Sequence, residues 1–168
     1  EVQGAMDMGL EFHSLSKSFN MTGWRVGFAI GNPEIVRALH IVKSNLDSGV
    51  PQAVQKMAIA ALEMPDDAME QRNAVYQRRR DLVIEVLSDI GLRVHTPSAG
   101  LYIWAKVPEG YNSASFTALL LDEKDLVVTP GTGYGSHGEG YVRLSLTLPE
   151  QDLSKALDRL SGWSIPSP

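Results

Sequence analysis

The sequence contains no cysteine, which excludes disulfide bonds and thiolate metal sites. It also lacks any run approaching the ~18 consecutive apolar residues that a membrane-spanning helix needs. Positive charge is not in surplus, since 20 acidic residues outnumber 15 basic ones and the formal net charge is −5. These absences argue against a nucleic-acid or membrane partner and favour a small molecule or a second copy of the chain.

Histidines are few, and their scatter gives no spacing typical of metal ligands: His13, His40, His95 and His137. We therefore expect no metal site. The first residues do not resemble a signal peptide, so a cytoplasmic location is expected. The chain starts at Glu1 and enters structure almost at once, from which we expect a piece of a longer protein.

What the chain does contain is typical of a folded protein. Hydrophobic residues make up 43% and charged residues 21% of its 168 residues. Strand and helix patterns alternate, which predicts an α/β fold. Strands are expected at 10–15, 26–30, 92–95, 101–107, 125–128 and 141–146, and helices at 34–43, 52–63, 66–90, 114–121 and 149–160.

Three of these segments carry further predictions. The run 26–30 is continuously apolar, which indicates a buried strand. The segment 44–51 is rich in turn residues. The helix 66–90 is long enough to link two lobes, and its three arginines at 78–80 lie among polar residues, so we expect them on a solvated face.

The run 13–27 places Lys17 among serines and Arg25 eight residues later beside glycines. A lysine amine forms a Schiff base with a carbonyl compound. Serine hydroxyls, here Ser14 and Ser16, together with a guanidinium are typical ligands of a phosphate. The alternatives are a solvated lysine and a surface arginine beside Trp24.

A second signal is Arg143, in the middle of an alternating strand pattern. A buried arginine needs a partner, and a carboxylate bound through two hydrogen bonds would satisfy it. A local Asp or Glu is the alternative partner. The glycine-rich segment 131–140 fits neither a P-loop nor a dinucleotide fingerprint, and we interpret it as a flexible loop leading into the Arg143 strand.

Residues 14–27 meet every defined position of the pattern Ser-x-Ser-Lys-x5-Gly-x-Arg-x-Gly, and so resemble the cofactor-lysine motif of class I/II aminotransferases, the fold type I pyridoxal-phosphate enzymes. The resemblance implies that Lys17 binds pyridoxal 5′-phosphate covalently. It also implies that Ser14, Arg25 and, with less support, Ser16 hold the phosphate. Residues 130–144 are similar to the family's C-terminal segment, which makes Arg143 the ligand of the substrate α-carboxylate.

The resemblance also implies an architecture. Residues 1–64 would be a remnant of the large cofactor-binding domain, 65–90 the long linking helix, and 91–168 the small C-terminal α/β domain. Family members are usually homodimers with sites at the interface, so the turn at 44–51 would approach a partner's site, with Asn45 as a substrate-binding residue. Residues 97–104 resemble a small-domain strand, where Tyr102 and Trp104 are expected to pack.

Residues 16–25 and 43–55 look most like LL-diaminopimelate aminotransferases. That resemblance implies amino transfer from LL-diaminopimelate to 2-oxoglutarate, with aspartate and alanine aminotransferases as nearby alternatives. Two other hypotheses stay open: an inactive portion that serves in folding or dimerisation, and a lyase or decarboxylase of the same fold. The aspartate, tyrosine and stacking aromatic that contact the cofactor in this family cannot be assigned in the sequence.

Overall fold

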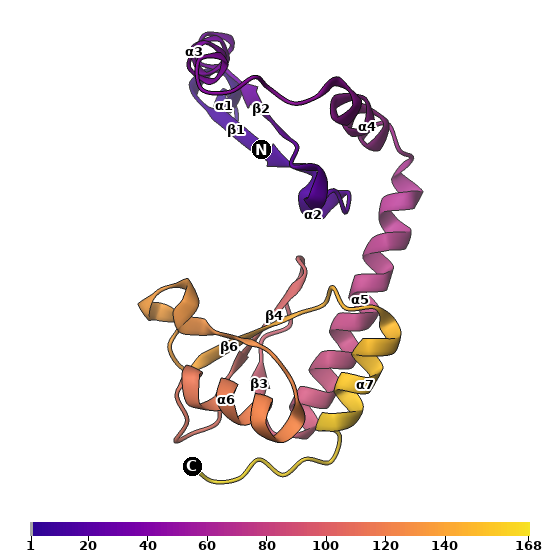
Figure 1. Cartoon of the computed structure of the whole chain (residues 1–168), viewed down its shortest axis with the longest axis vertical. Helices are drawn as coiled ribbons and strands as arrows, with labels where there is room; N and C mark the ends of the chain where they lie inside the picture. The colour runs from indigo at the N-terminus through magenta and orange to yellow at the C-terminus, as the bar shows by residue number, and fades with distance from the viewer. Residues whose placement is uncertain (1) are drawn as a thin grey trace. The chain divides into compact units, whose positions relative to one another are not determined.

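A computed structural model describes residues 2–168, which divide into two compact units (Figure 1). Unit 1 ends at Asp66 and unit 2 runs from Asp67 to Pro168. Both combine helices with antiparallel strands, so the chain has the predicted α/β character. Within residues 2–168, no helix combines the length and apolar character that a membrane crossing requires.

Unit 1 is built on a two-stranded antiparallel ribbon that pairs Ser14 with Gly27 and Leu10 with Gly31. Its elements are α1 (Ala5–Met8), β1 (Leu10–Ser14), α2 (Leu15–Ser18), η1 (Thr22–Trp24), β2 (Gly27–Gly31), α3 (Pro33–Ser44) and α4 (Gln52–Leu62). The buried core is small and consists of Leu15, Met21, Val26 and Ala58. The ribbon therefore holds together the two ends of the segment 15–26, which connects its strands.

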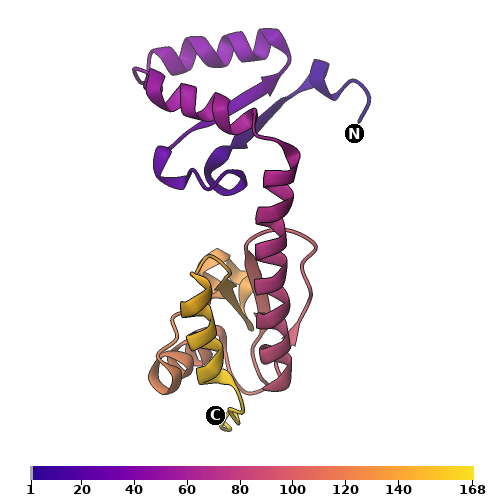
Figure 2. The same cartoon turned by 90° about the vertical axis from the view of Figure 1, so that its right-hand side faces the viewer.

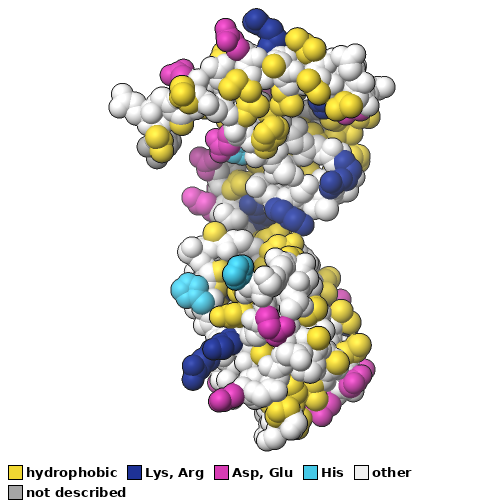
Figure 3. Space-filling view, turned by 90° about the vertical axis from the view of Figure 1, so that its left-hand side faces the viewer, with side chains coloured by type: hydrophobic (Ala, Val, Ile, Leu, Met, Phe, Trp, Pro, Cys, Tyr) yellow, Lys and Arg dark blue, Asp and Glu magenta, His cyan; other side chains and the backbone are white. Residues whose placement is uncertain are grey.

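The strand β2 is present where it was predicted, but the prediction that it is buried is wrong for this chain. Phe28 is 37% and Ile30 39% exposed. The strand has a single partner, and few side chains of unit 1 pack over it. Hydrophobic side chains accordingly show at many places on the surface of unit 1 (Figure 3).

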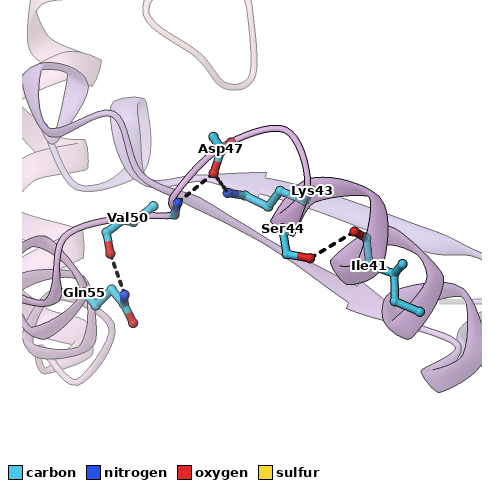
Figure 4. Close-up of polar contacts among 7 residues, drawn as sticks. Ile41, Lys43, Ser44, Asp47, Val50 and Gln55 are labelled. Carbon is cyan, nitrogen blue, oxygen red and sulfur yellow. Dashed lines mark hydrogen bonds and ion pairs between the residues drawn. The ribbon is translucent and has the colours of Figure 1, made fainter.

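The predicted turn at 44–51 is confirmed and is held by local hydrogen bonds (Figure 4). The carboxylate of Asp47 accepts from Lys43 Nζ at 2.6 Å and from Gly49 N at 2.8 Å. These bonds lower the pKa of Asp47, the lysine contributing most. Gln55 Nε2 donates to Val50 O at 2.6 Å and fixes the start of α4.

Unit 2 contains a four-stranded antiparallel sheet in the order β3-β4-β6-β5. The strands are β3 (Arg93–Val94), β4 (Tyr102–Lys106), β5 (Thr129–Pro130) and β6 (Tyr141–Ser145). The helices are α5 (Asp66–Asp89), α6 (Ser113–Lys124) and α7 (Glu150–Leu160), with the short turns η2 (Gly131–Tyr134) and η3 (Ser136–Gly138). The helices α5 and α7 lie side by side in both ribbon views (Figures 1 and 2).

Helices cover one face of this sheet. Ile103, Ala105 and Val142 point to that face with no exposed surface. They form one core with helix residues Val83 and Leu87 of α5, Phe116 and Leu120 of α6, and Leu153 and Leu160 of α7. Because side chains alternate along a strand, Tyr102, Trp104 and Arg143 lie on the other face.

The predicted strand at 125–128 is wrong. The helix α6 continues to Lys124 and ends at Asp125, whose φ of 51° is left-handed. Leu126 N then donates to Leu120 O at 3.1 Å, and the strand β5 begins only at Thr129. Residues 125–128 pair with no strand of the described chain; Leu126 packs on the core, while Val127 is 85% exposed.

The expectation of a solvated face at 78–80 is also wrong for two of the three arginines. Arg79 Nη1 donates to Leu146 O at 3.0 Å, and Arg80 Nη1 donates to Pro97 O at 3.1 Å. Both side chains are half-buried. They bind α5 to the backbone that follows β6 and to the backbone that precedes β4. The polar sequence at 78–80 therefore reflects hydrogen bonds to carbonyl groups and not exposure to solvent.

Candidate active site

The residues singled out in the sequence form two clusters, one in each unit. Ser14, Ser16, Lys17 and Arg25 belong to unit 1, and Arg143 belongs to unit 2.

The first cluster, the lysine cluster, lies where β1 passes into α2. Ser14 is the N-cap of α2, and its Oγ accepts from Ser16 N at 3.2 Å. Leu15 is buried and its N donates to Val26 O at 3.3 Å, which anchors the segment. Lys17 follows in the same turn with its side chain exposed.

Hydrogen bonds bring Arg25 back to this segment. Thr22 Oγ1 donates to Ser16 O at 2.9 Å, and Arg25 Nη1 donates to Thr22 O at 3.0 Å. The backbone of Arg25 is left-handed, with φ 51°, which is uncommon for a residue other than glycine and is often found at functional sites. Gly27 is required by the ribbon, because a Cβ there would lie 2.4 Å from His13 O.

The lysine cluster carries positive charge without a carboxylate partner. Within residues 2–168, neither Lys17 nor Arg25 forms an ion pair. The acidic residue nearest to Lys17 in sequence, Glu11, instead lies 3.0 Å from His13 Nε2. The Ser14 hydroxyl, which accepts one bond, keeps its own proton to donate. This donor set fits an anion such as a phosphate next to a reactive amine.

The second cluster, the arginine cluster, lies on the open face of the unit 2 sheet. The guanidinium carbon of Arg143 lies 4.1 Å from the ring centroid of Tyr102 and 4.4 Å from that of Tyr134. Trp104, directly opposite Arg143 across the strands, stacks on Tyr141 and meets Tyr134 edge-on. Arg143 is thus surrounded by aromatic rings.

The surroundings of Arg143 bear on two expectations from the sequence. The alternative in which a local Asp or Glu pairs with Arg143 is not found, since within the described chain its guanidinium has neither an ion pair nor a hydrogen bond. Tyr102 packs as expected, and the side chain that it packs against is Arg143. Tyr134 was not singled out as a site residue, although its place in the glycine-rich loop before the Arg143 strand was a usable signal.

The segment before Arg143 is held by a polar latch, formed by Ser113 and Glu139. The Glu139 carboxylate accepts from Ser113 N at 2.8 Å and from Gly140 N at 2.7 Å, and these bonds lower its pKa. Ser113 is fully buried, and its Oγ accepts from Gly140 N at 2.9 Å and from Tyr141 N at 3.2 Å. The latch fastens the start of α6 to the start of β6.

Asn45 is not brought to either cluster by any contact found in residues 2–168. Its Nδ2 donates to Ile41 O at 2.7 Å, so the side chain closes the end of α3. A cavity of about 620 Å³ in unit 1 is lined by neighbouring residues of that turn, Ser44 and Asp47, and by Leu15 and Val26. Lys17 and Arg25 do not line this cavity, so it is separate from the lysine cluster.

The chain is similar to known aminotransferases over nearly its whole length. The family model for aminotransferase class I and II matches residues 2–160. LL-diaminopimelate aminotransferase of Dehalococcoides mccartyi is 60% identical over 163 residues, which are 97% of this chain and 42% of that protein. The enzyme of the same name from Desulforudis audaxviator is 54% identical over 162 residues, 96% of this chain and 41% of that protein.

A solved structure of an aminotransferase from Staphylococcus aureus has a similar fold, with a TM-score of 0.86 and 39% identity. The match covers 94% of this chain and 42% of that one. The chain therefore spans about two fifths of the length of the relatives that it matches.

Proposed function

The chain belongs to the aminotransferase class I and II family, and on that premise we propose that it is part of an enzyme that transfers an amino group from LL-diaminopimelate to 2-oxoglutarate. In this enzyme it supplies the cofactor lysine, Lys17, and the carboxylate-binding arginine, Arg143. The observation that carries the proposal is the lysine cluster, in which Thr22 links the segment of Lys17 to Arg25 by two hydrogen bonds. Within residues 2–168 neither Lys17 nor Arg25 has a carboxylate partner. The identity of 60% to an LL-diaminopimelate aminotransferase supports the substrate.

In this proposal the chain is the C-terminal part of a fold type I enzyme. Residues 1–64 belong to the large domain, 65–90 form the linking helix, and 91–168 are the small domain. The enzyme is a homodimer in the cytoplasm, and Asn45 contributes to a substrate site from its turn. The chain alone has no residues assigned to the pyridine ring of the cofactor, so we expect it to be inactive by itself.

The residues of the lysine cluster fit pyridoxal 5′-phosphate. Bound there, the cofactor supplies a carbonyl carbon for amines and an electron sink for the α-carbon of the amino acid. Ser14, Ser16 and Arg25 would hold its phosphate through hydroxyl and guanidinium hydrogen bonds. Lys17 Nζ would be the amine that binds it covalently.

In the proposed reaction the Lys17 amine is the group that moves the substrate proton. Its Nζ would remove the proton from the α-carbon of the amino acid and return it to the carbonyl-derived carbon of the cofactor, which is general base and general acid catalysis by one group. Arg143 orients the substrate by binding its α-carboxylate through two N–H groups. In this proposal the residue that transfers the proton belongs to unit 1 and the residue that binds the carboxylate belongs to unit 2.

The proposal is tested first on the chain itself. Pyridoxal 5′-phosphate is added, the mixture is reduced with borohydride, and labelled peptides are identified by mass spectrometry. We expect the label on Lys17, its loss in Lys17→Ala, and its retention in Lys56→Ala, which removes another exposed lysine of unit 1. Labelling spread equally over the lysines would contradict a dedicated cofactor lysine.

The reaction is tested in a chimera in which this chain replaces the matching segment of the D. mccartyi enzyme. We expect formation of glutamate from 2-oxoglutarate with LL-diaminopimelate as the donor, and much slower reaction with aspartate or alanine. Release of carbon dioxide, or a product without the transferred amino group, would identify a decarboxylase or lyase instead. No reaction of the chimera with any donor would refute the transaminase proposal.

A further inference from the structure

Arg143 is held in a setting that differs from that of an ordinary arginine on a sheet. Its guanidinium carbon lies over the rings of Tyr102 and Tyr134 at 4.1 and 4.4 Å. A cation over an aromatic face within about 6 Å is attracted by the ring. Two such contacts restrict the rotation of the guanidinium plane, while its N–H groups remain unbonded within the described chain.

The two tyrosines are held by different means. Tyr102 belongs to β4, adjacent to the Arg143 strand in the sheet. Tyr134 belongs to the short turn η2, outside the sheet, and its side chain is 50% exposed. The Tyr134 ring is therefore placed by its loop and by its edge-on contact with Trp104, at a centroid distance of 5.7 Å.

The loop of Tyr134 is itself fixed at both ends. Gly131 and Gly138 approach so closely that neither has room for a Cβ. The Ser113–Glu139 latch then fastens the residues that follow. Such bracing is unnecessary for a solvated tyrosine, but it is needed if the ring must keep one position over Arg143.

We propose that Tyr134 is a positioning residue, which with Tyr102 holds the Arg143 guanidinium in the orientation that binds a substrate carboxylate. The proposal rests on the proposed function, because it takes Arg143 as the carboxylate ligand. The ring provides the interaction and the hydroxyl does not, so phenylalanine can replace Tyr134 while leucine cannot. Orienting the guanidinium before binding lowers the ordering cost of binding and thus strengthens carboxylate affinity.

The test follows the Arg143 side chain directly by NMR. The Nε–Hε signal of Arg143 is assigned in the ¹⁵N-labelled 168-residue chain by its disappearance in Arg143→Lys, and 2-oxoglutarate is then titrated in. The variants are Tyr134→Leu, Tyr134→Phe and Tyr111→Leu. The last removes another tyrosine of unit 2, one that packs on Phe116 and not on Arg143, and so controls for general destabilisation.

In the unaltered chain we expect the ring currents of Tyr102 and Tyr134 to displace the chemical shift of the Arg143 Nε–Hε signal. We also expect this chemical shift to change when 2-oxoglutarate is added. In Tyr134→Leu the displacement should fall and the dissociation constant should rise about three- to tenfold, which corresponds to the cost of ordering one long side chain on binding. Tyr134→Phe and Tyr111→Leu should keep both. An unchanged signal and affinity in Tyr134→Leu would overturn the proposal, as would equal weakening in Tyr134→Phe or no response of the unaltered chain.

The outcome is separable from that of the proposed function. A chimera that fails to transfer amino groups, together with an Arg143 signal that behaves as expected, refutes the transaminase and leaves the role of Tyr134 in carboxylate binding. An active chimera whose Michaelis constant for 2-oxoglutarate is unchanged by Tyr134→Leu overturns the positioning role and leaves the transaminase.

Discussion

Gly131 and Gly138 lie back to back in the loop before β6, so close that a Cβ on either would be 2.0 Å from the carbonyl oxygen of the other. Both are buried, although the loop between them is exposed. This contact closes the loop that carries Tyr134. The two glycines are therefore required by the approach of two backbone segments, not by a phosphate.

Replacing Gly131 with alanine should destabilise unit 2 and disturb the Arg143 site. The methyl group would force the two backbone segments apart, and overpacking of this kind costs about 1–3 kcal/mol. Gly133→Ala is the matched control, because its Cβ would meet only Thr129 Cγ2 at 3.7 Å. Thermal unfolding of the two variants measures the difference, and equal stability would contradict the close contact.

The Glu139 carboxylate should make stability depend on pH in the acidic range. Its hydrogen bonds from Ser113 N and Gly140 N hold the pKa below the usual value of 4.5. The unfolded chain then binds the proton more readily than the folded one, so the contribution is complete above about pH 4.5 and is lost as the pH falls through the folded pKa.

Denaturant unfolding between neutral pH and pH 3 measures this dependence. Asp47 has a lowered pKa as well and contributes with the same sign. The comparison must therefore be between the unaltered chain and Glu139→Gln, in which only the Glu139 contribution is missing. We expect the stability difference between the two chains to shrink as the pH falls. If the stability difference stayed constant with pH, the Glu139 carboxylate would not form these hydrogen bonds in the folded chain.

Ser113 should be among the most sensitive polar positions of unit 2. Its hydroxyl is fully buried and accepts from Gly140 N and Tyr141 N. In Ser113→Ala, Tyr141 N loses this acceptor while Gly140 N keeps its bond to Glu139, and we expect a cost of about 1–3 kcal/mol. Ser98→Ala, at an exposed serine, should change stability by less than about 0.5 kcal/mol. Chemical unfolding measures the free energy of unfolding of both variants. Equal losses in the two variants would contradict a stabilising role of the Ser113–Glu139 latch.

Much of the fold could be predicted because its signals are local. The helix α3 begins where Pro33 follows Asn32, whose side chain accepts from Glu34 N at 2.8 Å and Ile35 N at 3.2 Å. The turn at 44–51 depends on Asp47 and on Gly49, whose φ is +83°. Such features are determined by a few adjacent residues, and these segments formed within one or two residues of their predicted bounds.

What could not be predicted depends on residues distant in the sequence. The apolar run of β2 has the composition of a buried strand, but its burial depends on neighbours that unit 1 of this chain does not provide. Arg79 looked solvated because its partner, Leu146 O, lies 67 positions away. The position of the Tyr134 ring over Arg143 likewise depends on the path of the loop 131–140. The family resemblance assigned a role to Arg143 but none to Tyr134.

Arg25 should show opposing demands of stability and cofactor binding. Its backbone is left-handed, with φ 51°, a conformation that costs residues with a Cβ about 1–2 kcal/mol and costs glycine almost nothing. Arg25→Gly and Arg25→Ala both remove the guanidinium. We therefore expect both to weaken the binding of pyridoxal 5′-phosphate, because a phosphate ligand is lost, while the glycine variant is more stable than the alanine variant by about 1 kcal/mol.

Arg25→Lys completes the comparison, since it keeps a positive charge and the backbone cost but loses the planar set of N–H donors. It should bind the cofactor better than the alanine variant and less well than the unaltered chain. Cofactor affinity is measured by absorbance titration, and stability by thermal unfolding without cofactor. If the alanine and glycine variants were equally stable, the left-handed backbone would carry no cost. If all three variants kept full affinity, Arg25 would not be a phosphate ligand, and its conformation would need a purely structural explanation.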